Sequence, residues 1–147
     1  MDLSAAAAGA AARPDQPDRR TRTVTTLTPA PRTPQRLITD LFSVIDERRW
    51  DELAEVFAPG CVYERPGYRP LSGLADIDHF YRHTRIISSG RHLVDRVVAD
   101  HGSAACWGHF TGQDRSGRPL EEGFADAYLV QDGKIVRRTT YFFRAAI

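Results

Sequence analysis

The second half of the chain carries three closely spaced turn signals, and these restrict the possible folds more than any other feature. Each signal combines Asp with Gly within a few residues, as reverse turns do: Asp100-His101-Gly102, Asp114-Arg115-Ser116-Gly117 and Asp132-Gly133. They separate four runs of strand-like composition, at residues 92–99, 104–111, 120–130 and 134–145. Strands that follow one another through short turns predict a four-stranded antiparallel meander.

The segment before the meander predicts three helices and one short strand. Thr33 and Pro34 are suited to cap and start a helix, and the apolar residues that follow recur at helical spacing. A second helix is predicted over residues 51–57, ended by Pro59-Gly60, then a strand over 61–66 and a third helix over 73–85. This order predicts an α+β domain with helices packed on one face of a bent antiparallel sheet.

The first 33 residues differ in composition from the rest. They are rich in Ala, Pro, Thr and Arg and contain almost no large apolar side chains, which predicts a disordered N-terminal tail before a domain at 34–147. Asp2 precedes the alanine run and the first arginine is Arg13, so the basic region of a secretory signal is missing.

Overall composition excludes several functional classes. The 147 residues carry a net charge of +1, which favours neither nucleic acid nor acidic membranes as a partner. No apolar run approaches the ~18 residues that a membrane-spanning helix needs. Cys61 and Cys106 match no metal-binding spacing and predict two buried thiols in a reducing, cytoplasmic compartment.

An aspartate interrupts the apolar face of the third meander strand, Gly123-Phe-Ala-Asp-Ala-Tyr-Leu-Val130. In a strand Phe124, Asp126 and Tyr128 share one face, so the carboxylate lies among aromatic rings. Burying a carboxylate is costly unless it is paired or used. If the Asp132-Gly133 turn has two residues, Asp126 lies opposite Thr139, which orients it; a bulge brings in Arg138 instead.

Four segments in this order resemble the nuclear-transport-factor-2-like superfamily, in its SnoaL-like polyketide cyclase and ketosteroid isomerase branch. They are VFAPGCVYERPGYRPLSG, ADIDHFY, VVADHGSAACWGHFTG and FADAYLVQDGKIVRRTTYFF. The resemblance covers about residues 37–143 and implies a cone, in which a curved sheet and three helices enclose a pocket. It implies no cofactor, because these relatives move protons with side chains alone.

The resemblance also assigns roles. It places Asp126 where ketosteroid isomerases keep a pocket carboxylic acid and Tyr81 where they keep a pocket tyrosine. Dehydratase and cyclase relatives use a pocket histidine, which suggests His92. The isomerase base is an aspartate before a proline; here Arg65 precedes Pro66, with Glu64 one step earlier. The family register turns Arg65 inward, and a slip of one residue would turn Glu64 inward instead.

Two further features set this chain apart from particular relatives. Leu41 stands where the isomerases have a first-helix tyrosine, so a steroid-isomerase reaction is not expected. The epoxide-hydrolase branch needs an arginine where this chain has Phe124 and an acid on the last strand, where it has none.

The pocket and the outer face of the sheet are expected to bind different partners. A small apolar metabolite would lie against the pocket residues Tyr63, Cys106, Phe110, Phe124, Tyr128, Thr139 and Tyr141. Trp107, Ala125, Ala127 and Leu129 give the outer face an apolar surface that suits a homodimer, with His109 beside it. His79 and His83 have the spacing of two zinc ligands but lie off the buried stripe of their helix, so no metal site is expected.

Two functions remain open from the sequence. The first is a small cofactor-free enzyme that isomerises, cyclises or dehydrates an apolar carbonyl compound. Asp126 and His92 would move its proton, and Tyr81 or Arg65 would stabilise the enolate. The alternative is a non-catalytic domain that binds a hydrophobic ligand or serves as a dimerising scaffold.

Overall fold

The computed structural model describes residues 32–144, so most of the predicted tail lies outside the described residues. Helix α1 (Pro34–Asp46) starts as the sequence predicts: the Thr33 side chain accepts a hydrogen bond from the Arg36 backbone N–H. Its apolar side is buried, with Leu37, Ile38 and Leu41 fully covered. None of the helices in this part of the chain is long and apolar enough to cross a membrane.

The remaining elements follow in the predicted order with shifted boundaries. They are the 3-10 turn η1 (Trp50–Glu52), α2 (Leu53–Val56), β1 (Phe57–Glu64), β2 (Leu71–Ser72), α3 (Leu74–His79), the π-helical turn η2 (Phe80–Thr84), β3 (Ile87–Asp100), β4 (Ser103–Asp114), β5 (Pro119–Gln131) and β6 (Lys134–Phe142). The short second helix ends at Val56, because Phe57 already extends to pair with Ile135 of β6.

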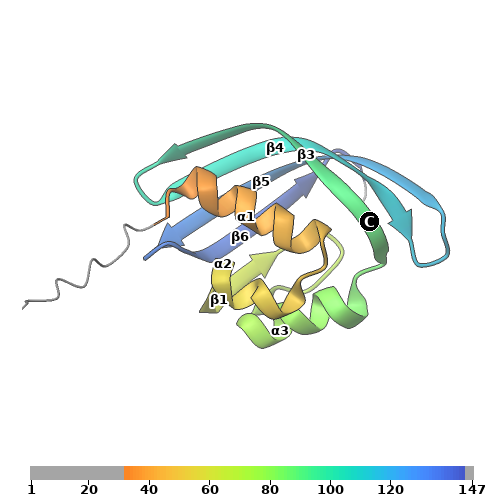
Figure 1. The fold of residues 1–147 in the computed structure, drawn as a ribbon, viewed down its shortest axis with the longest axis horizontal. Helices are drawn as coiled ribbons and strands as arrows, with labels where there is room; N and C mark the ends of the chain where they lie inside the picture. Colours follow the sequence, from red (N-terminus) through yellow and green to blue (C-terminus); the bar gives the residue numbers. More distant parts are fainter. Residues whose placement is uncertain (1–31, 145–147) are drawn as a thin grey trace, which may run out of the picture.

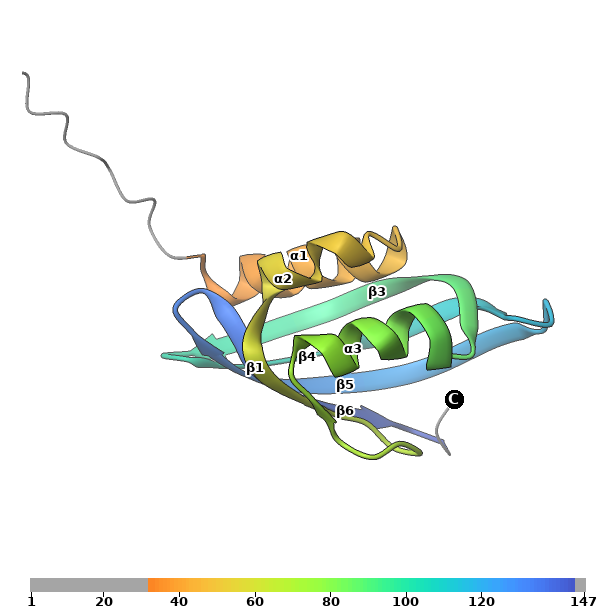
Figure 2. The same ribbon diagram turned by 90° about the horizontal axis from the view of Figure 1, so that it is seen from below.

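One six-stranded sheet organises the molecule, in the order β2-β1-β6-β5-β4-β3. Strands β3 to β6 form the predicted antiparallel meander, but β1 runs parallel to β6, so the sheet is mixed rather than purely antiparallel. Figure 1 shows the long strands arching behind α1, and Figure 2 shows α1 and α3 on the same side of the sheet. The α+β cone is confirmed.

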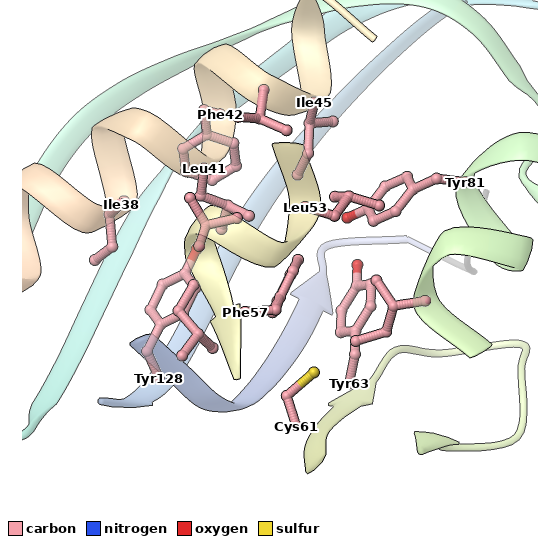
Figure 3. Packing of buried hydrophobic residues seen from close by; sticks show 14 of the residues in the cluster. Ile38, Leu41, Phe42, Ile45, Leu53, Phe57, Cys61, Tyr63, Tyr81 and Tyr128 are labelled. Atoms are coloured by element: carbon pink, nitrogen blue, oxygen red, sulfur yellow. The ribbon is translucent and has the colours of Figure 1, made fainter. Parts of the chain in front are cut away.

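The core lies between the helices and the concave face of the sheet. Figure 3 shows the α1 side chains Ile38, Leu41, Phe42 and Ile45 in this layer, with Phe57 below them. The hydroxyl ends of Tyr63 and Tyr81 lie near one another in the same interior. One end of the core therefore contains polar atoms, and the candidate functional site lies there.

Candidate functional site

A narrow cavity opens at the polar end of the core. The space available to the centre of a water molecule is only about 20 Å³, within a region of about 400 Å³ that is not filled by protein atoms and is partly open to solvent. Its lining comes from α1, β1, η2 and the four meander strands: Ile45, Tyr63, Arg65, Tyr81, Arg85, Ile87, His92, Phe110, Phe124, Arg138, Thr140 and Phe142. An apolar cavity with a few convergent polar groups is the usual form of a small-molecule site.

Arg138 on β6 organises the polar side of the cavity. Its Nε and one terminal nitrogen donate to Asp126 Oδ2 at 3.2 and 2.7 Å, and the other terminal nitrogen donates to the Tyr81 hydroxyl at 3.0 Å. Burial is the largest single influence and lowers the pKa of Arg138, but Asp126 together with the surrounding tyrosine hydroxyls outweighs it and raises this pKa well above its usual value. Arg138 thus stays cationic and links Asp126 to the cavity.

Asp126 points into the cone, as its strand position predicts, but its carboxylate is fully engaged. Besides Arg138, Oδ2 accepts from the Tyr128 hydroxyl at 2.8 Å, and Oδ1 accepts from Thr140 Oγ1. The side chain is not exposed and does not line the cavity. Asp126 therefore contacts the cavity only indirectly, by holding Arg138, which lines it.

The pKa values of the two cavity tyrosines are shifted in opposite directions. Burial raises the pKa of Tyr81 to about 12, so its hydroxyl keeps its proton. That hydroxyl accepts from Arg138, which leaves its own proton available for a ligand oxygen. Burial also opposes ionisation of Tyr63, but Arg138 and Arg65 outweigh it and place the pKa of Tyr63 below its usual value.

His92 on β3 forms a dyad with Asp46, the last residue of α1. Its Nδ1 lies 2.5 Å from Asp46 Oδ1, and its backbone N–H donates to Oδ2 of the same carboxylate at 2.8 Å. The ring is buried among Phe42, Phe110 and Phe124. Burial lowers the pKa of His92 against the opposing effect of Asp46. The ring is therefore neutral at pH 7, with Nδ1 protonated toward Asp46 and Nε2 carrying a lone pair.

The first strand follows the predicted family register. Arg65 is buried, lines the cavity, and lies over the rings of Tyr68, Phe80 and Phe142. Glu64 lies on the other side of the strand, where it accepts from Arg137 at 2.7 Å and from Thr139 at 3.1 Å. The alternative with Glu64 inward is therefore excluded.

Not all of the predicted pocket residues reach the cavity. Tyr63, Phe110 and Phe124 line it. Cys106 and Tyr128 are buried beside Asp126, with Cys106 Sγ 3.6 Å from the Tyr128 hydroxyl, but neither lines the cavity.

Thr139 and Tyr141 lie on the outer side of the sheet and not in the pocket, so this part of the prediction was wrong. Asp126 pairs with Thr140 and Tyr128 with Arg138, because the register shifts by one residue between Leu129 and Val130. The bulge turns Arg138 and Thr140 inward and Thr139 and Tyr141 outward. Tyr141 is 57% exposed.

Asp46 and Arg85 are site residues that the sequence did not indicate. In the sequence, Asp46 and Arg85 each lie at the end of a predicted helix, and no motif marks either residue as functional. Only the tertiary contact of α1 with β3 brings Asp46 to His92, and only the π-helical turn carries Arg85 to the cavity. Such turns are frequent at functional sites.

Cysteines and histidines elsewhere offer no metal site in the part of the chain that the structure describes. Cys61 and Cys106 are buried and unpaired, and burial raises the pKa of each thiol to about 11. The rings of His79 and His83 lie 4.9 Å apart, yet no group of three or more possible ligands forms within residues 32–144.

Comparisons with known proteins agree with the fold described above. Residues 38–138 match the model of the SnoaL-like domain family. Curated protein sequences gave no match. The structure of a proposed SnoaL-like polyketide cyclase from Jannaschia sp. CCS1 is similar at 14% identity and a TM-score of 0.65, covering 76% of this chain and 90% of that one.

Two other solved structures are similar over the same share of this chain. IdmH from Streptomyces antibioticus, a proposed polyketide cyclase, is 20% identical with a TM-score of 0.66, over 76% of this chain and 93% of its own. A proposed ketosteroid isomerase from Kribbella flavida is 26% identical with a TM-score of 0.62, over 76% and 78%. The family match and the shared cone show that this chain belongs to the SnoaL-like family of the nuclear-transport-factor-2-like superfamily.

Proposed function

We propose that the protein is a cofactor-free acid–base enzyme that moves a proton next to a carbonyl group in a small, largely apolar metabolite. The observation that carries the proposal is the Asp46–His92 dyad, which faces the same cavity as the Tyr81 hydroxyl. A base and a hydrogen-bond donor on one cavity are the two groups that enolisation requires.

His92 is the general base in this scheme. Asp46 holds Nδ1–H, so Nε2 is the nitrogen available to take a proton from carbon. The imidazolium that forms is stabilised by the carboxylate beside it. Burial keeps the resting ring neutral, so the base form dominates at neutral pH.

Tyr81 is the donor to the developing enolate oxygen. Arg138 donates to the Tyr81 oxygen and thereby makes its proton a better donor. Asp126 fixes Arg138, and Thr140 in turn donates to Asp126, so both are positioning residues. Isomerisation, ring closure or loss of water would each follow from the same enolate, as expected for SnoaL-like polyketide cyclases.

The alternative function is a non-catalytic domain that binds a hydrophobic ligand or dimerises. It is supported by the narrow cavity, by the full engagement of Asp126, and by Leu41 at the position of the isomerase tyrosine. Proton exchange at carbon separates the two functions, because a binding domain has no need of a base.

The test is exchange of the benzylic α-protons at C1 of 2-tetralone, a cyclic ketone with a fused benzene ring, for deuterium, monitored by proton NMR in D₂O. The wild type should exchange the proton faster than buffer, and His92→Gln should slow it by ~10²–10⁴-fold. The rate should fall as pH drops through the pKa of His92, which lies below its usual 6.5, and should stay level above it.

The matched control is His109→Gln, since His109 is exposed on the outer face at 66% of its side chain. It should exchange like the wild type. If His92→Gln matches the wild type, or if the wild type does not exceed buffer, the alternative function is favoured.

A further inference from the structure

Arg85 is a cavity residue that the proposed proton transfer does not use. Its backbone N–H donates to the Phe80 carbonyl at 2.8 Å, and its carbonyl accepts from Arg115 Nε at 3.0 Å. These bonds fix the junction between η2 and β3. The guanidinium lies 5.6 Å from the centre of the Tyr81 ring and 5.8 Å from that of Phe110. The side chain is thereby directed into the cavity.

Within residues 32–144, no carboxylate balances the charge of Arg85. Arg85 is 7% exposed, its Nε has no hydrogen-bond partner within residues 32–144, and no carboxylate there forms an ion pair with it. Burial lowers its pKa; Tyr81 and Tyr63 oppose this shift, and the nearby charges of Arg65 and Arg138 add to it. A buried cation in this state is costly unless a ligand supplies the counter-charge.

Among the arginines of the cavity, Arg85 differs from Arg138, because residues 32–144 supply it with neither an ion pair, as Asp126 does for Arg138, nor a partner for its Nε. Three arginines line the cavity, Arg65, Arg85 and Arg138, whereas its lining within residues 32–144 includes no Asp or Glu. Asp126 is behind the lining and is engaged by Arg138. The Asp46 carboxylate is directed at His92. An uncharged, purely apolar ligand would leave the charge of Arg85 without a counter-charge.

We propose that the cavity binds an anionic ligand, a carboxylate attached to an apolar or aromatic body, with Arg85 holding the anion. A guanidinium presents paired N–H donors that match the two oxygens of a carboxylate. Phe110, Phe124 and Ile87 would contact the body of the ligand. As a statement about the substrate this rests on the proposed function, whereas the binding itself does not require catalysis.

The experiment compares benzoate with benzamide, which share size and shape but differ in charge, by protein NMR titration at millimolar concentration. Wild type should bind benzoate at least tenfold more tightly than benzamide, with shifts at residues of the cavity. Arg85→Gln should abolish this preference. Arg85→Lys should keep part of it, because the charge remains but the paired donors are lost.

Arg36→Gln is the control for the loss of one positive charge, because Arg36 lies on the surface of α1 with 70% of its side chain exposed. It should retain the preference. Equal binding of both probes, no saturable binding of benzoate, or an unchanged preference in Arg85→Gln would overturn the proposal.

His92→Gln separates this proposal from the proposed function. It should slow exchange of 2-tetralone yet keep the preference for benzoate. If it leaves exchange unchanged while the Arg85-dependent preference persists, only the acid–base mechanism fails.

Discussion

At the scale of single residues, the ion pair with Arg138 explains why an aspartate, Asp126, is tolerated on the buried apolar face of β5. Both side chains are buried, with exposed fractions of 0% and 4%. Removing one partner of such a pair leaves the other charge without compensation, whereas replacing both partners is often tolerated. Each partner is therefore needed while the other is present, and the pair also positions the Tyr81 hydroxyl.

Asp126→Asn should lower the free energy of unfolding by about 3–5 kcal/mol, because it leaves Arg138 charged and buried. The double variant Asp126→Asn, Arg138→Met should lose less than the single variant, since it removes both charges. Urea denaturation measures both values. A loss below about 1 kcal/mol in Asp126→Asn would show that the pair contributes little to stability.

At the scale of elements, close approach of β3 and β4 shapes the sheet beside the cavity. Gly108 on β4 pairs with Val94 and Phe124, next to the register shift between Val94 and Arg96. A Cβ at this position would collide with the Leu93 carbonyl oxygen, which is backbone and cannot turn away. Glycine is required there by packing, not by its conformational freedom.

Gly108→Ala should therefore destabilise the protein by about 1–3 kcal/mol, as overpacking does. Gly60→Ala is the matched control, because a Cβ there meets no atom within 4 Å. It should change stability by no more than about 0.5 kcal/mol. Thermal unfolding followed by circular dichroism compares the two, and equal melting temperatures would contradict the packing argument.

At the scale of the whole molecule, the convex face of the sheet carries an apolar patch. The outer patch consists of exposed, mostly apolar residues on adjacent strands: Leu93, Val98, Trp107, Ala125, Ala127, Leu129 and Tyr141. Trp107 is 42% exposed in the middle strands and pairs with Ala125, which pairs with Tyr141. Exposed apolar side chains gathered on one face of a sheet favour association.

We expect the protein to form a homodimer through the outer patch. Trp107→Glu should make it monomeric, because a buried carboxylate at the interface would be unpaired. Gln35→Glu adds the same charge at an exposed position of α1 and should stay dimeric. Sedimentation velocity distinguishes the species, and a monomeric wild type or a dimeric Trp107→Glu would contradict the expectation.

Local patterns in the sequence determined the meander, the amphipathic first helix, and the inward position of Asp126. Each depends on residues near in sequence: Asp132-Gly133 selects the turn, with positive φ at both residues, and alternation selects the face. The sequence left two partners open for Asp126, Thr139 without a bulge and Arg138 with one; the structure has the bulge, which nothing local signals, and Arg138 bonds Asp126.

Tertiary structure alone decided which of these groups meet. Asp46 and His92 are 46 residues apart in sequence, and the parallel pairing of β1 with β6 joins segments that no short-range pattern relates. Arg85 reaches the cavity because a π-helical turn ends the third helix there. Local periodicity reports which side of an element is buried, whereas the partner on the other side depends on how the whole chain packs.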